Sequence, residues 1–329
     1  MGGSGGASRT AVMVCQGRAA AHGRLAPGRF DDPTALALLL PAERGIVEQV
    51  RAGDAPAGWG PRLTFEMVRA CAEVMAPRTV AIDEAVRQAL PSTDDPALAA
   101  GSAADATPAD ATPADAAPAA TAQVVILGAG LDGRAWRMVE LAATPVFEVD
   151  HPASQRDKRD RAGELAGELV AGASPCFVPV DFSRDDLAAA LAAAGHRRSV
   201  PTIWIWEGVV PYLTRSQAAR TLQIIGDRSA PGSRLIVHYH TPAPSAPLGR
   251  WAARLLSALS RQANPMAREP NRSVWTPGAM RRAVGARGFA VARDDSLLTL
   301  ARDLDTPIQH RRSLRNGRIL VADRAPTPG

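Results

Sequence analysis

Aromatic residues, cysteines and long apolar runs are all scarce in this sequence. Phe, Trp and Tyr make up 4% of the 329 residues, so the chain lacks the aromatic platform on which nucleic-acid bases stack. Cys15, Cys71 and Cys176 show no CxxC spacing, which argues against a disulfide framework and a cysteine-rich zinc site. No apolar run approaches the roughly 20 residues of a membrane-spanning helix.

Basic charge is present but is not gathered into a patch. The formal net charge is +5, and Lys158 is the only lysine among 38 basic residues, which are interleaved with 33 acids. This scatter follows an Ala/Arg-rich composition and gives no reason to expect nucleic acid as a partner. The apolar run at 11–15 is shorter than a signal-peptide core. We therefore expect a cytoplasmic protein that binds no membrane.

A composition shift divides the chain at 91–122. The pentad Ala-Thr-Pro-Ala-Asp at 106–110 is repeated at 111–115 and then decays into alanine and proline. Regular prolines disfavour helix, and no large side chain is available for burial. The segment is predicted to be a disordered linker between an N-terminal part, 1–90, and a C-terminal domain, 123–329.

The N-terminal part has the apolar spacing of helices. Phe65, Val68, Cys71 and Met75 recur at helical intervals. Pro77 is expected to end this helix, and a second one is expected to follow up to residue 90. Because these helices alone make a thin core, we interpret 1–90 as a helical lid on the C-terminal domain.

Short apolar segments alternate with helical ones after the linker, as in parallel βαβ units. We expect an α/β, Rossmann-like domain whose ligand crevice lies at the carboxyl ends of the strands. An insertion at 241–275 is interpreted as a small substrate cap. The expected strands are at 123–127, 145–149, 176–180, 202–206, 234–239, from 289 onward, and 318–322.

Local signals mark several helix boundaries. The segments 183–186 and 214–217 have the capping-box pattern, and Gly195 suits the end of the first of these helices. The other expected helices begin at about Gly133, span 153–169, and run from near Thr276 to just before Gly288.

A glycine motif supplies the strongest chemical signal. The buried-strand run at 124–127 enters Gly128-Ala129-Gly130-Leu-Asp-Gly133, a GxGxxG turn that lets backbone amides approach a ligand. Asp150 follows Gly130 by 20 residues, the interval at which a carboxylate can bind ribose hydroxyls. Glu148 shares its strand face, but Asp150 lies nearer the carboxyl end. These features alone fit a nicotinamide oxidoreductase and an S-adenosylmethionine methyltransferase equally.

Longer motifs discriminate between these two classes. The segments LGAGLDGRAWRM, FEVDHP and WIWEGVVPYL, with APRTVAIDEAVR and GRFDDPTA upstream, resemble the leucine carboxyl methyltransferase family. That family includes protein phosphatase carboxyl methyltransferases and bacterial small-molecule O-methyltransferases. The resemblance implies a class I methyltransferase fold with a seven-stranded, mostly parallel sheet, and S-adenosyl-L-methionine as the cofactor.

The resemblance also implies roles for particular residues. Arg78 would pair with the methionine carboxylate of the cofactor and Asp150 would hold the ribose. Glu207 ends a hydrophobic strand, where its charge needs a cationic partner, either the cofactor ammonium or a structural arginine. Phe182 departs from the leucine common in bacterial members. The other implied cofactor contacts are Arg18 near the N-terminus, Gly128, Ala129 and Gly130 in the glycine turn, and Asp181 with Phe182 at the adenine.

The acceptor side is less defined by sequence. A carboxylate acceptor needs no base, whereas a hydroxyl would benefit from one. The candidate catalytic residues are therefore Tyr212, which the resemblance places at the pocket mouth, and His238 and His240, which share one strand face. The two histidines lack a third ligand at a recognisable spacing, so no metal site is predicted.

These inferences lead to one preferred function and several alternatives. We expect an S-adenosylmethionine-dependent O-methyltransferase acting on a carboxylate or hydroxyl of a small molecule, such as a bacterial secondary metabolite of the polyketide type. The alternatives are a protein C-terminal carboxyl methyltransferase, an NAD-dependent oxidoreductase, and a cofactor-binding protein without transfer activity.

Overall fold

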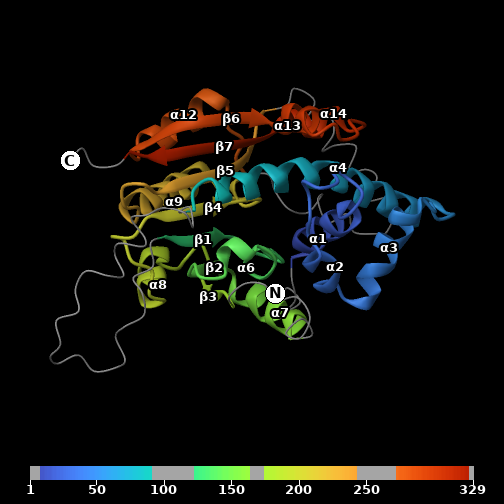
Figure 1. Cartoon of the computed structure of the whole chain (residues 1–329), viewed down its shortest axis with the longest axis horizontal. Helices are drawn as coiled ribbons and strands as arrows, with labels where there is room; N and C mark the ends of the chain where they lie inside the picture. The colour runs from blue at the N-terminus through green and yellow to red at the C-terminus, as the bar shows by residue number, and fades with distance from the viewer. Residues whose placement is uncertain (1–7, 91–121, 164–173, 243–271, 326–329) are drawn as a thin grey trace.

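A seven-stranded sheet forms the centre of the protein (Figure 1). The computed structural model describes residues 8–90, 122–163, 174–242 and 272–325. The strand order across the sheet is β3-β2-β1-β4-β5-β7-β6. The strands are β1 (Gln123–Leu127), β2 (Val146–Asp150), β3 (Cys176–Pro179), β4 (Thr202–Trp206), β5 (Arg234–His240), β6 (Phe289–Ser296) and β7 (Gly317–Arg324).

The loops that follow β1, β2 and β4 begin at the same edge of the sheet, because these strands run in the same direction. Strands β1 to β5 pair in parallel, and only β7 runs antiparallel to its neighbours β5 and β6. Leu127, the last residue of β1, is in register with Val149 of β2 and Trp206 of β4. The three loops that follow these strands therefore start side by side. The predicted α/β fold with a mostly parallel, seven-stranded sheet is confirmed.

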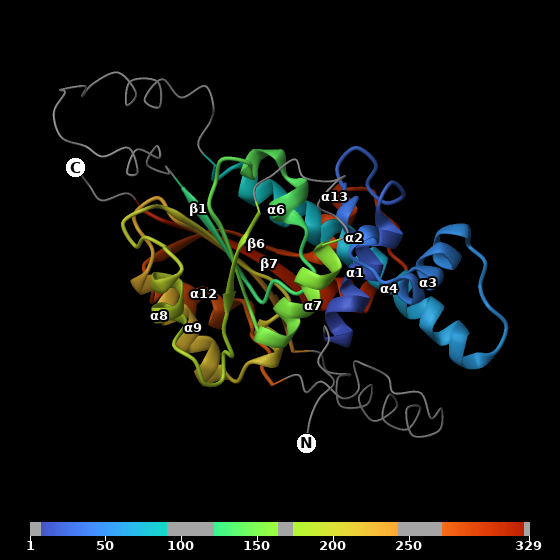
Figure 2. The same cartoon turned by 90° about the horizontal axis from the view of Figure 1, so that it is seen from below.

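Helices cover both faces of the sheet, which explains why β1 and β4 are buried at every position and apolar after their first residue (Figure 2). One face packs against α8 (Leu187–Ala193), α9 (Arg215–Asp227) and α12 (Pro277–Gly285). The opposite face packs against α4 (Trp59–Arg87), α6 (Arg134–Arg137), α13 (Leu297–Asp303) and α14 (Arg311–Asn316).

Residues 8–90 build a helical cluster at one end of the sheet (Figure 1). Helix α4 belongs to two cores at once, since Val68 and Ala76 face the other N-terminal helices while Ile82 and Val86 face the sheet. The N-terminal part is therefore joined to the sheet through α4. Its other helices are α1 (Arg9–Ala21), α2 (Thr34–Ala37) and α3 (Pro41–Ala52), and α7 (Pro152–Ala162) follows β2.

The predicted helix break at Pro77 is wrong. Helix α4 continues through Pro77 from Trp59 to Arg87. An internal proline costs about 3 kcal/mol because a backbone hydrogen bond is lost and the ring crowds the preceding turn. The apolar residues on both sides of Pro77 are buried in the two cores, and their burial outweighs that cost.

One of the two predicted capping boxes is also wrong. Ser183 does not begin a helix, because its hydroxyl and N–H both donate to the Asp181 carboxylate. Helix α8 starts later, where the Asp186 carboxylate accepts from the N–H groups of the next turn. The box at 214–217 is confirmed as the start of α9, and Gly195 follows the end of α8 with a positive φ of 94°.

Other boundaries differ or stay untested. The helix expected from Gly133 is only one turn, α6, and α13 and α14 were not predicted. The linker, apart from residue 122, and residues 243–271 of the proposed cap lie outside the described residues, as does the end of the helix expected over 153–169. Within the described ranges, no helix combines the length and apolarity needed to cross a membrane.

Candidate functional site

The glycine turn after β1 is shaped by close contacts that only glycine allows. Gly128 has φ +72°, and a Cβ atom there would lie 2.0 Å from a methyl group of Val209. A Cβ on Gly133 would lie 1.8 Å from the Thr34 hydroxyl. The loop after β4 and the start of α2 therefore pack directly against the glycine turn. Glycine is required at these positions for this packing as well as for the turn itself.

A cavity of about 360 Å³ opens above this turn. Helix α1 closes one side of it with Ala11 and Val14, and the loop after β4 closes another with Gly208 and Val209. The volume lies within the range of small-molecule sites. Eight of the predicted site residues line it: Arg18, Arg78, Gly128, Ala129, Gly130, Asp150, Glu207 and Tyr212.

A second cavity of about 320 Å³ continues the first, sharing Asp150, Val209 and Tyr212 as lining residues. It is lined also by Asp181 and Phe182, the two residues predicted at the adenine. The Asp181 carboxylate accepts from Ser183, which lowers the pKa of Asp181, and it pairs with Arg184 at 3.0 Å. The predicted contacts therefore follow one hollow that runs from Arg78 past Asp150 to Phe182.

Asp150 sits where the two cavities meet. Its carboxylate accepts from the backbone N–H of Gly130 at 2.5 Å and from that of His151 at 2.6 Å. Burial raises the pKa of Asp150, and these two donors oppose the shift. The carboxylate thus supports the glycine turn while it faces the ligand space.

Glu148 occupies a different environment, although it shares the strand face of Asp150. It is fully buried, accepts from Lys158 Nζ at 2.5 Å, and lines neither cavity. The Lys158 ammonium also donates to the Asp132 carbonyl at 2.6 Å. Position along β2 therefore separates a carboxylate that lines the cavities, Asp150, from one that is paired in the interior, Glu148.

The charge of Glu207 is neutralised by two arginines. Its Oε1 lies 2.7 Å from Arg78 Nε, and its Oε2 accepts from Arg134 Nη1 at 2.7 Å. Burial raises the pKa of Glu207, but the charges of Arg134, Arg78 and Arg18 lower it to about 2. The cationic partners required at the end of β4 are thus two arginines of the chain itself, Arg78 and Arg134.

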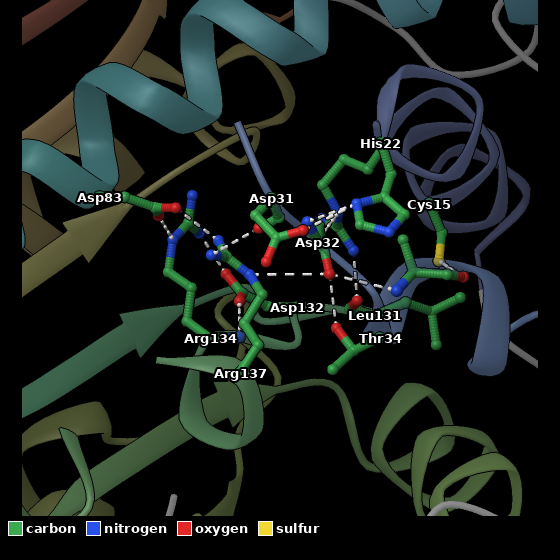
Figure 3. Close-up of polar contacts among 12 residues, drawn as sticks. Cys15, His22, Asp31, Asp32, Thr34, Asp83, Leu131, Asp132, Arg134 and Arg137 are labelled. Atoms are coloured by element: carbon green, nitrogen blue, oxygen red, sulfur yellow. Dashed lines mark hydrogen bonds and ion pairs between the residues drawn. The ribbon is translucent and has the colours of Figure 1, made fainter. Parts of the chain in front are cut away.

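Sequence reasoning missed the ion-pair network behind this site (Figure 3). Arg134 also donates to Asp83 at 2.7 Å and pairs with Asp132, and the other Asp83 oxygen lies 2.7 Å from Arg137. All these side chains are at most 7% exposed. The available signal was the presence of Asp83 and Arg134 inside the family motifs, but neither showed its partner.

Arg18 connects helix α1 to the same network. Its Nε lies 2.8 Å from Asp32, and its Nη2 donates to the Leu131 carbonyl at 2.5 Å. Asp32 also accepts from Thr34, at the start of α2. The helix that covers the cavity is therefore fastened to the glycine loop by a buried charge.

His238 and His240 lie on one face of β5, with ring centroids 5.0 Å apart, but neither lines a described cavity. Burial and the charge of Arg78 lower the pKa of both, that of His240 to about 4. Their role as base or acceptor contact stays a prediction.

Among the described residues, no three His, Cys, Asp or Glu side chains are grouped to hold a metal.

Comparisons with known proteins agree with the motifs. The family model described as leucine carboxyl methyltransferase matches residues 91–226. Three relatives named "Putative S-adenosyl-L-methionine-dependent methyltransferase" come from Mycolicibacterium smegmatis (44% identical over 37% of this chain), Streptomyces coelicolor (46% over 34%) and Mycobacterium avium (36% over 55%). The chain spans only 38%, 39% and 56% of the length of these relatives. The matched residues 91–226 include the glycine turn, Asp150 and Glu207, and over this part the chain is similar to the leucine carboxyl methyltransferase family.

Proposed function

We propose that this chain is an S-adenosyl-L-methionine-dependent O-methyltransferase acting on a carboxylate or hydroxyl of a small molecule. The observation that carries the proposal is the pair of opposite charges in one cavity, Arg78 and Asp150, on either side of a glycine turn. An arginine fork suits the amino-acid carboxylate of the cofactor, and a carboxylate suits its ribose hydroxyls.

The cavity walls support the fit to this cofactor. Gly128 and Gly130 both line the cavity, and the lack of a side chain lets a ligand approach their backbone atoms closely. Arg78 uses Nε for Glu207, and its two terminal nitrogens have no hydrogen-bond partner among the described residues. These nitrogens are therefore available to a carboxylate.

A nicotinamide dinucleotide suits the site less well. In dinucleotide-binding proteins the pyrophosphate lies on the helix N-terminus that follows the glycine turn. Here the Asp132 carboxylate already accepts from the Arg134 N–H at 2.8 Å, at the start of α6. That carboxylate would repel a pyrophosphate, and α6 has only four residues.

The chain's part in the reaction is positioning. When bound, S-adenosylmethionine supplies an electrophilic methyl group on a sulfonium centre. Arg78 would fix the amino-acid end of the cofactor and Asp150 its ribose, while α1 over the cavity would exclude water. Tyr212 lines both cavities and would border the acceptor. An acceptor carboxylate would attack directly, and a hydroxyl would first lose its proton to a base, for which His240 is the candidate.

Calorimetric titration with S-adenosylhomocysteine and, in parallel, with NADH tests the proposal. We expect micromolar binding of the first and none of the second, because only the first carries the carboxylate that Arg78 fits. Labelled methyl donor with panels of carboxylate and phenol acceptors then tests transfer. Binding of NADH alone would restore the oxidoreductase, and cofactor binding without turnover on any acceptor would favour a binding protein.

A further inference from the structure

Four buried charges form a closed ring behind the cofactor cavity. Arg78 pairs with Glu207, Glu207 with Arg134, and Arg134 with Asp83, each at 2.7 Å. Asp83 stands five residues after Arg78 on the same helix, α4, so the backbone closes the ring. The other two members come from the loop after β4 and from α6. The ring therefore couples three segments that meet at the cavity.

The two arginines of the ring differ in what their donors contact. Arg134 is 1% exposed and lines neither cavity, and its Nε and Nη1 are bound to Asp83, Asp132 and Glu207. Arg78 lines the cavity and uses only Nε within the ring. Arg134 thus serves the protein interior, while Arg78 keeps its terminal fork for a ligand.

Glu207 lies between the two arginines and forms an ion pair with each of them. Each of its oxygens is engaged by a different guanidinium, so the carboxylate is held between them. Without Arg134, the second oxygen would lose its donor in a buried site. The strongest remaining option is a bidentate pair with Arg78. Such a pair would occupy a terminal nitrogen of Arg78 and turn its fork away from the cavity.

We propose that Arg134 is a positioning residue that holds Glu207 so that the terminal nitrogens of Arg78 stay directed at the cofactor carboxylate. This inference rests on the proposed function. It predicts that replacing Arg134 weakens binding of the amino-acid end of the ligand and leaves binding of the adenosine end unchanged. The adenosine end would be bound by Asp150 and the second cavity, whose lining residues lie outside the ring.

That selectivity gives a sharp test. Arg134→Gln is titrated with S-adenosylhomocysteine and with 5′-methylthioadenosine, which shares the adenosine and thioether but lacks the amino-acid carboxylate. We expect the first affinity to fall by about tenfold, as for a misplaced charged hydrogen bond, and the second to change less than twofold. Arg161→Gln is the matched control, because Arg161 is a buried arginine paired with Glu43 and Asp157 and lines neither cavity.

A second variant covers the case in which Arg134→Gln does not fold. Asp83→Asn weakens the support of Arg134 from the far side of the ring, and we expect a smaller loss with the same preference for the carboxylate-bearing ligand. Equal losses for both ligands, or no loss for either, would overturn the positioning role. If the wild-type protein binds S-adenosylhomocysteine no more tightly than 5′-methylthioadenosine, the amino-acid carboxylate contributes nothing to binding. Arg78 then does not hold that carboxylate, and the inference fails. Binding of neither by the wild type would overturn the proposed function itself.

Discussion

Replacing Asp150 with alanine is expected to weaken S-adenosylhomocysteine binding by about ten- to a hundredfold. The variant removes a charged acceptor from the junction of the two cavities, and hydrogen bonds to charged groups contribute about 1.5–3 kcal/mol. It also removes the acceptor for the Gly130 N–H, which the carboxylate binds at 2.5 Å. Both effects act on the adenosine side of the site. Binding of 5′-methylthioadenosine should therefore fall by the same factor, in contrast to Arg134→Gln.

Calorimetry on Asp150→Ala, Asp150→Asn and Asp227→Ala measures this effect. Asparagine keeps one acceptor oxygen and should lose less affinity than alanine. Asp227 ends α9 and lines neither described cavity, so its replacement controls for a general loss of surface charge. Melting temperatures recorded in parallel separate weakened binding from unfolding. Unchanged affinity in Asp150→Ala would mean that the ribose is held by another group.

The sheet was predictable where local sequence and burial coincide. Strands β1 and β4 have the predicted bounds because each is a continuous apolar run after its first residue, as expected of strands covered on both faces. The helix break at Pro77 was not predictable, since the burial that keeps α4 continuous comes from residues far away in sequence. Local rules describe one segment at a time, and α4 is stabilised by two cores.

The candidate site also contains residues that the sequence predicts and residues that only the fold identifies. Gly128, Asp150 and Glu207 were predictable because each lies at the carboxyl end of a strand or directly after it, and the carboxyl ends of parallel strands meet at one edge. The partners of Arg134 lie 51 and 73 residues away, at Asp83 and Glu207. In a chain with 38 basic residues, nothing local distinguishes a buried arginine from a solvated one. Only the fold identifies which arginines form the ring.

His238→Leu is expected to raise the free energy of unfolding by about 1–3 kcal/mol at pH 8. His238 is 3% exposed, and neither ring nitrogen has a hydrogen-bond partner among the described residues. It faces the apolar layer that contains Leu297 and Ile319. Leucine has a similar volume and no polar atom, so the substitution removes the desolvation cost of an unpaired group. Chemical denaturation followed by circular dichroism measures the change.

The gain from His238→Leu should widen as the pH falls. Burial, with the charges of Arg78 and His240, lowers the pKa of His238 well below 6.5, so the folded protein leaves this imidazole neutral. The unfolded chain takes up that proton below about pH 6.5, which favours unfolding at acid pH. Leucine removes this proton uptake, so the variant should lose less stability than the wild type between pH 8 and pH 5.

His196→Leu supplies a control with the opposite expected sign. His196 is also buried and its pKa is lowered to about 4, but its ring contacts the Thr202 hydroxyl at 3.2 Å and the Arg228 guanidinium at 3.1 Å. Its replacement should destabilise the protein at pH 8, because both ring hydrogen bonds are lost from a buried site. If His238→Leu behaves like His196→Leu, or abolishes the proposed methyl transfer while cofactor binding stays intact, the imidazole has a partner in the proposed reaction. The catalytic role predicted for His238 from the sequence would then replace the structural one.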